Sequence, residues 1–204
     1  MTEISRDDAW RLVTEWVESD SLRKHVLGVE ACMRAYARRW DEDEELYAVT
    51  GLVHDLDYER YPDLETGHPR YAIEELERLE YPQEVIDAVA GHAEVLGVPR
   101  ESRLAKTLYA VDELSGFVAA CALVRPTGIE GMKPRSVKKK LKQASFAAAV
   151  DRDQIQRGIE ELGVDSDEHM AVVIEAMAEE GEALGLAAPE GEGETAPTAG
   201  GSTA

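Results

Sequence analysis

The sequence predicts an all-α protein, a single-domain helical bundle, and three observations support this prediction. Apolar residues recur at steps of three and four over most of the first 185 residues, which is the period of an amphipathic helix. No segment alternates apolar and polar residues as a half-buried strand does. Residues that favour helix starts precede several of the periodic runs. The length of 204 residues suits one domain over residues 1–185 followed by a tail over 186–204.

The N-terminal part of the chain predicts three helices. Ser5, with Asp8 three residues later, resembles a capping box that opens a helix to about residue 19. Asp20 or the serine after it is expected to cap a long second helix, and His25 lies on the apolar face of that helix. A third helix is expected over residues 43–54.

Further helices and loops are expected up to residue 185. Residues 55–67 and 125–134 break the helical period and contain proline and glycine, so each is expected to be a loop. Thr66, Ser102 and Asp151 are expected to cap helices that follow them. The remaining expected helices cover residues 68–79, 82–92, 102–124, 136–150 and 165–184.

Composition and charge limit the class of partner. The formal net charge of −20 repels nucleic acid and anionic membranes, so neither is expected as a bulk partner. No apolar run approaches the ~18–20 residues of a membrane span, and the N-terminus lacks the apolar stretch of a signal peptide. Two isolated cysteines, Cys32 and Cys121, are expected to be small buried residues in a reducing cytoplasm. The residues from 186 onward are expected to form a disordered acidic tail.

Histidines are the first candidates for chemistry. The chain contains His25, His54, His68, His92 and His169. A lone histidine on an apolar helix face is more often a hydrogen-bonded core residue than a ligand. The first four, however, fall on inward faces or helix ends of different helices, and convergent histidines with carboxylates suit a divalent first-row metal. The fifth, beside Asp167 and Glu168, is expected to lie on the surface.

The segment from Gly51 to Asp55 is the sharpest local feature. Apolar residues lead a helix inward and place His54 and Asp55 side by side at its end. Burying these two groups unpaired would cost several kcal/mol, so they need a partner of opposite charge or a metal. The alternative is an ordinary helix C-terminus, with the histidine against the helix dipole and the aspartate in a turn.

These residues resemble the motif of the HD-domain superfamily of metal-dependent phosphohydrolases, in which a histidine, a later His-Asp pair and a distant aspartate bind a metal. The matching residues are His25, His54, Asp55 and Asp112. The resemblance covers about residues 20–125, which would form the metal core, with a basic loop and helix and the C-terminal helices in 126–185. The segment from Tyr109 to Gly116 also resembles the family. Where the HDIG-like subgroup has Ile-Gly after the pair, this chain has Leu-Asp, and Asp57 could instead orient a ligand histidine.

Some members of the superfamily bind two metals through two further histidines, while the aspartate of the pair bridges the metals. His68 and His92 lie in the required interval, each near a helix end. The resemblance therefore implies one or two divalent transition metals per chain, with Mn, Fe, Co, Ni or Zn favoured by a histidine-rich site. The alternative is that the two residues only begin and end helices.

A cluster of basic residues is the expected phosphate site. A lysine that some relatives carry shortly after the His-Asp pair is absent, and five of the seven lysines fall between residues 133 and 142. Positive groups near an acidic metal cradle would steer and bind an anionic substrate. The expected phosphate contacts are Lys133, Arg135, Lys138, Lys142 and Arg70. The alternative is a solvated helix face whose lysines pair with acids.

The resemblance implies a phosphohydrolase that cleaves a small phosphorylated substrate, such as a nucleotide or metabolite, with metal-activated water. The expected catalytic residues are His54, Asp55 and Lys138. Two alternatives remain open at this point. The same six ligands could hold two irons that oxidise a substrate with O₂, or the bundle could be a non-catalytic metal- or nucleotide-binding module. The oligomeric state is also open, because the amphipathic first and last helices could form the contact of a homodimer or simply pack on the core.

Overall fold

The computed structural model describes residues 4–188, and these residues form helices with no β-strand, as predicted. The helices in chain order are α1 (Arg6–Trp16), α2 (Asp20–Trp40), α3 (Glu44–Val53), α4 (Arg70–Arg78), α5 (Gln83–His92), the short 3₁₀ helix η1 (Glu94–Leu96), α6 (Arg103–Leu123), α7 (Pro134–Leu141), α8 (Arg152–Leu162) and α9 (Ser166–Glu179).

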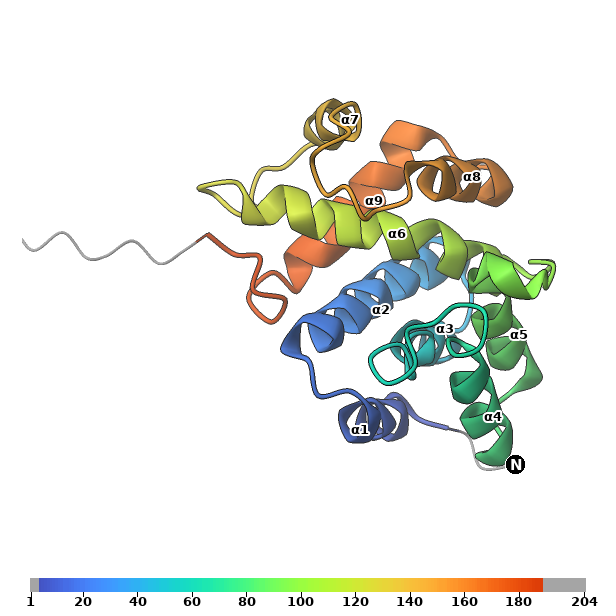
Figure 1. Ribbon diagram of the computed structural model, residues 1–204. Coiled ribbons are helices and arrows are strands. Elements are labelled where there is room, and N and C mark those ends of the chain that lie inside the picture. The colour runs from blue at the N-terminus through green and yellow to red at the C-terminus, as the bar shows by residue number, and fades with distance from the viewer. Residues whose placement is uncertain (1–3, 189–204) are drawn as a thin grey trace, which may run out of the picture.

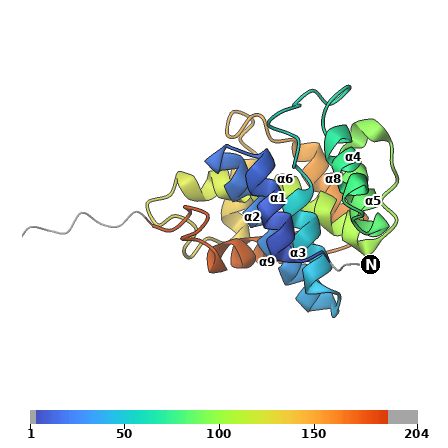
Figure 2. The ribbon, with the colours of Figure 1, turned by 90° about the horizontal axis from the view of Figure 1, so that it is seen from below.

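Helix α6 runs through the middle of the bundle, with α2, α3 and α5 on one side and α7 and α8 on the other (Figure 1). Helix α3 packs most closely against α2, and α1 lies beside α3 (Figure 2). One group of buried apolar side chains fills the space between α2, α6 and the C-terminal helices. A second group fills the space among α1, α3, α4 and α5.

Several helix starts follow the sequence signals. Ser5 and Asp8 form a complete capping box at α1, and the side chains of Ser102 and Asp151 cap α6 and α8. Each cap satisfies backbone N–H groups that have no partner inside the helix. The two cysteines are buried and free, as expected.

Two expected caps are wrong. Helix α2 is capped by Ser19, one residue before the expected position. Thr66 caps no helix, because its hydroxyl donates to Asp63 within the loop, and α4 begins later, after Pro69.

The helix expected over 136–150 is also wrong in its extent, since α7 ends at Leu141 and turns follow. The reason is Arg152, whose guanidinium donates to main-chain carbonyls. The accepting carbonyls belong to Leu141, Gln143, Phe146, Ala147 and Val150. These hydrogen bonds take the place of the backbone hydrogen bonds of a helix. A carbonyl needs a donor, and a side chain can supply it as well as a helical N–H group.

The C-terminal end of the described chain differs from the expected tail. Helix α9 ends at Glu179, before the expected residue 184. Leu186, expected to begin a disordered tail, is buried, and its carbonyl accepts a hydrogen bond of 2.8 Å from the backbone of Ile129. The rest of the expected tail, 189–204, lies outside the described residues. Within residues 4–188, no helix has both the length and the apolar character needed to cross a membrane.

Candidate metal centre

Six side chains from distant parts of the sequence meet at one point, and they are the six expected ligands. His25 lies in the second turn of α2, and Asp112 lies in the middle of α6. His54 and Asp55 directly follow α3, whose residues from Tyr47 to Val53 are all buried, so this helix carries the pair into the interior. His68 precedes α4, and His92 is the last residue of α5.

A first ligand group consists of His25, His54 and Asp112. Oδ1 of Asp112 lies 3.1 Å from Nε2 of His25 and 3.5 Å from Nε2 of His54. Oδ2 of Asp55 faces the same two ring nitrogens, at 3.6 and 3.5 Å.

A second ligand group consists of His68 and His92. Their Nε2 atoms lie 3.1 Å apart. Oδ1 of Asp55 lies 3.5 Å from the first of these nitrogens and 3.6 Å from the second. The two oxygens of Asp55 therefore face two different ligand groups.

The spacing of these atoms fits metal coordination. Ligand atoms at about 2.0–2.2 Å from a metal and about 90–110° apart lie roughly 2.8–3.6 Å from one another. The separations within both groups run from 3.1 to 3.6 Å. Each group together with Asp55 can therefore surround a cation without rearrangement.

The tautomers of three histidines also favour a metal site. The Nδ1–H group of His54 donates to the carbonyl of Gly51 at 2.8 Å, and that of His92 donates to the carbonyl of Val89. The Nδ1–H group of His68 donates to Asp57 at 2.7 Å. Each Nε2 consequently directs a lone pair toward Asp55, because a neutral imidazole carries only one proton.

A cation would remove two otherwise unfavourable features of this arrangement. The lone pairs of His68 and His92 face each other, and Nε2 of His54 is buried without a hydrogen bond. Within residues 4–188 that atom is the one buried side-chain nitrogen or oxygen that lacks such a bond. Buried polar groups without partners are costly, so the donor set fits a divalent metal.

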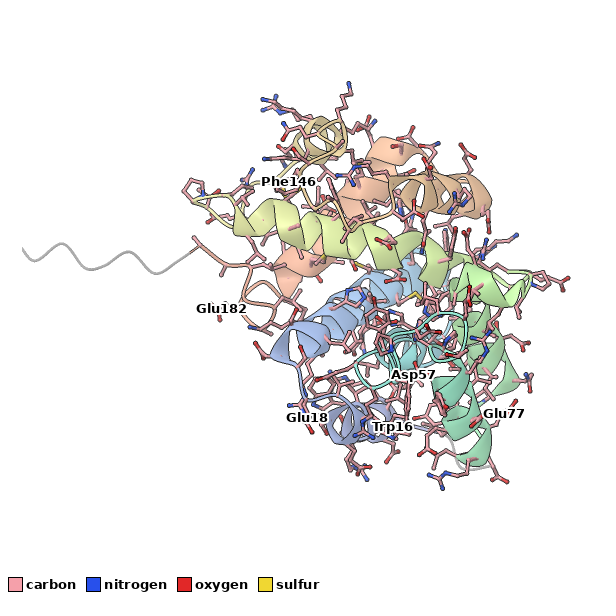
Figure 3. The ribbon with its side chains drawn as sticks, in the orientation of Figure 1. Trp16, Glu18, Asp57, Glu77, Phe146 and Glu182 are labelled. Atoms are coloured by element: carbon pink, nitrogen blue, oxygen red, sulfur yellow. The ribbon has the colours of Figure 1, made fainter. Side chains whose placement is uncertain are left out.

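Asp57 holds the second ligand group in place. Its side chain is fully buried beside α3 (Figure 3). One carboxylate oxygen accepts from His68, and the other accepts from the backbone N–H of Ala72 in α4 at 3.0 Å. Asp57 therefore orients a histidine, as the sequence suggested.

Without a metal, attraction between a protonated histidine and the ionised aspartates stabilises the cluster. Burial lowers the pKa of His54, but the charges of Asp55 and Asp112 outweigh it and raise the pKa to about 9. Burial raises the pKa of both aspartates, but the adjacent histidines bring it well below the usual range. Metal binding would release such protons, because ligand histidines must be neutral.

A cavity of about 1090 Å³ opens over the ligands. Its walls come from the first turn of α2, the loop after α3, the end of α5, one face of α6, the start of α8 and residues 184–186. Burial and the charge of Asp112 raise the pKa of Glu113, which also lines the cavity, to about 7.

The structure does not bring the expected phosphate contacts to this cavity. None of Lys133, Arg135, Lys138, Lys142 and Arg70 lines it. Helix α7 buries Val137 and packs against α9 and α6, and Phe146 lies between α7 and α6 (Figure 3). Lys138 pairs with Asp167 at 2.9 Å, and Arg70 donates to the carbonyl of Leu64.

Lys24 lines the cavity instead. It directly precedes His25 in α2. A single lysine in an amphipathic helix gives no signal in the sequence, whereas the conspicuous lysine cluster lies elsewhere.

His169, expected on the surface, is completely buried. Its Nε2–H group donates to the carbonyl of Ala110 at 3.0 Å, and its Nδ1 accepts from the hydroxyl of Tyr36. A helical signal for burial was present, because Val173 and Ala176, four and seven residues later, are also buried.

Comparison with known proteins gives one match. Residues 22–116 match the family model described as the HD domain, and this range includes all six candidate ligands. No curated protein and no solved structure matches the chain.

Proposed function

We propose that this chain, which carries an HD domain, is a phosphohydrolase that binds two divalent metals on either side of Asp55 and cleaves a phosphate ester. One observation carries the proposal: each carboxylate oxygen of Asp55 faces its own group of ring nitrogens, all within 3.6 Å. A carboxylate between two such groups is suited to bridge two metals.

The first metal would be held by His25, His54, Asp112 and Asp55, and the second by His68, His92 and Asp55. Four histidines favour Mn, Fe, Co, Ni or Zn over Mg, which prefers oxygen ligands. Divalent metals bound here would supply Lewis acidity toward a phosphoryl group and would acidify water near neutral pH.

The residues of the chain contribute positioning. The carbonyls of Gly51 and Val89 and the carboxylate of Asp57 fix three imidazole rings, so that little reorganisation is needed for binding. The buried side of the cluster excludes water, and the cavity leaves the other side open to a substrate.

The experiment measures metal content and hydrolysis together. Protein loaded with Mn²⁺ is assayed on p-nitrophenyl phosphate, bis(p-nitrophenyl) phosphate and a nucleotide panel, and atoms of metal per chain are counted. Asp55→Asn should lose both metals and hydrolysis. Asp87→Asn, an exposed aspartate on α5, is the matched control and should keep both.

Two results would contradict the proposal. One is a wild-type protein that binds two metals per chain and hydrolyses no phosphate ester, which would favour a binding module. The other is consumption of O₂ by the iron-loaded protein in place of hydrolysis, which would favour an oxygenase.

A further inference from the structure

The charge of the cavity lining is uneven. Apart from the ligands, acidic side chains line it at several points, namely Asp20, Glu59, Glu94, Glu113 and Asp151. Among the described residues that line the cavity, Lys24 is the one lysine or arginine. An anionic substrate therefore has a single cationic side chain available beside the metal centre.

Lys24 is placed to reach a substrate. Its ammonium lies 2.7 Å from Asp20, one turn earlier in α2, and its side chain is 39% exposed. An exposed ion pair of this kind contributes little to stability, so a phosphate group can displace the carboxylate. The ammonium also lies against Gly185, where a Cβ atom would stand 3.2 Å from Nζ, so the C-terminal turn bounds its movement.

We propose that Lys24 binds the phosphate group of the substrate, and that the cavity accepts esters with one phosphate group on a largely apolar organic part. This inference rests on the proposed function, because it takes the phosphate to lie at the metal centre.

The charge balance favours one phosphate group. Two divalent metals on Asp55 and Asp112 leave a positive centre, and Lys24 adds to it. Beyond this centre the lining is acidic and would repel further phosphates. A diphosphate or triphosphate would place charge near Glu59, Glu94 or Asp151. Arg157 pairs with the last two, at 3.0 and 3.8 Å, but it does not line the cavity, so the lining offers further phosphate groups carboxylates and no second cation.

The shape of the cavity favours an apolar organic part. From Asp112 the lining continues along α6 through Gly116, Ala119 and Leu123 at steps of three and four, which keeps these residues on one face. Eleven residues of helix extend about 16 Å. Met177 and Leu184 also line the cavity. The small residues Gly116 and Ala119 leave room beside α6 for an organic group.

The first experiment compares two lysines with matched surroundings. Lys24 and Lys138 are each 39% exposed and each pair with an aspartate, at 2.7 and 2.9 Å, but only Lys24 lines the cavity. Lys24→Met should weaken orthophosphate binding to the metal-loaded protein, measured by calorimetry, by about 10–100-fold. It should lower kcat/KM for p-nitrophenyl phosphate by a similar factor, while Lys138→Met should stay within about twofold of wild type.

Two further variants sharpen this comparison. Lys24→Arg should recover part of the phosphate affinity, because the positive charge remains. Asp20→Asn should tighten phosphate binding, since it removes the competing carboxylate. Equal metal content and equal Tm in all variants exclude an indirect effect through the metal centre or the fold.

The second experiment tests the single phosphate group. AMP, ADP and ATP are compared as competitors of p-nitrophenyl phosphate hydrolysis at one low, buffered concentration of free Mn²⁺, which keeps the two sites filled and leaves the nucleotide phosphates largely metal-free. Their inhibition constants should rise with the number of phosphate groups. Constants that fall from AMP to ATP would overturn the substrate class.

The outcomes separate this inference from the proposed function. If wild-type protein hydrolyses esters but Lys24→Met matches Lys138→Met in turnover and in phosphate binding, the inference fails and the function stands. If wild-type protein hydrolyses nothing, the function fails, and orthophosphate titration still decides whether Lys24 binds phosphate.

Discussion

Two buried histidines in this molecule differ in what surrounds them. His54 and His169 are both completely buried. Both ring nitrogens of His169 have hydrogen-bond partners, the hydroxyl of Tyr36 and the carbonyl of Ala110. His54 uses one nitrogen on the carbonyl of Gly51, and its other nitrogen has no hydrogen bond.

The difference shows that burial alone does not identify a ligand. Burial lowers the pKa of His169 to about 4, so it stays neutral and serves as a polar link between α2, α6 and α9. His54 lies within 3.5 Å of oxygens from both Asp55 and Asp112, where a cation would be stabilised. A free ring nitrogen facing carboxylates is the feature that separates the two environments.

The largest expected effect comes from removing His54, with replacement of His169 as the comparison. His54→Ala should lose the metal of the first ligand group. Mutation of residues that only support metal ligands typically costs about 10–100-fold, and the loss of phosphate-ester turnover in His54→Ala should be larger. His169→Gln should keep both metals and turnover. Metal content per chain and kcat/KM measure the contrast, and metal loss in His169→Gln would remove the distinction between the two environments.

The next effect is a pH dependence of stability that belongs to His169. Its pKa is about 4 in the folded protein against 6.5 as the reference for the unfolded chain. The stabilising contribution is therefore fully present above pH 6.5, because both states are neutral there. As pH falls toward 4, only the unfolded chain takes up the proton, so the free energy of unfolding decreases by about 3 kcal/mol.

His169→Gln should lack this part of the pH dependence. Urea unfolding of metal-free wild type and variant between pH 7 and pH 4 measures it, since the other titrating groups are common to both. Parallel curves for the two proteins would show that His169 is protonated when folded, contrary to its hydrogen bonds.

A smaller effect is expected at Asp57, which supports the second ligand group and not the first. Asp57→Asn removes the charged acceptor of His68 and should weaken metal binding at the second group by about 10–100-fold. The first group should bind as in wild type, because its histidines do not contact Asp57. Calorimetric titration resolves the two sites, and equal weakening of both would mean that the groups do not act separately.

The sequence predicts the parts of the molecule that depend on local pattern. Capping residues such as Ser5 and Ser102 and the apolar run before His54 predict helices and an inward-facing pair, and the structure has both. The six candidate ligands are predicted as a set because each lies at a helix face or end that the family resemblance requires.

What the sequence does not predict depends on contacts between distant segments. The turns after α7 form because Arg152 binds their carbonyls, and no periodicity indicates such contacts. The lysine cluster is prominent in the sequence, but the packing of Val137 places it away from the cavity. Lys24 reaches the cavity through the position of α2, which only the assembled bundle defines.

The smallest expected effect concerns the link between the two environments, because α2 carries both His25 and Tyr36. Tyr36→Phe removes the donor to His169 and should lower the free energy of unfolding by about 1 kcal/mol. Tyr36 and His25 lie eleven positions apart, about 16 Å along α2, so the effect should not reach the metals. Tyr36→Phe combined with His54→Ala should therefore be additive in unfolding experiments within about 0.5 kcal/mol. A larger coupling would mean that α2 transmits strain from the buried histidine to the metal centre, and the two environments would then have to be treated as one.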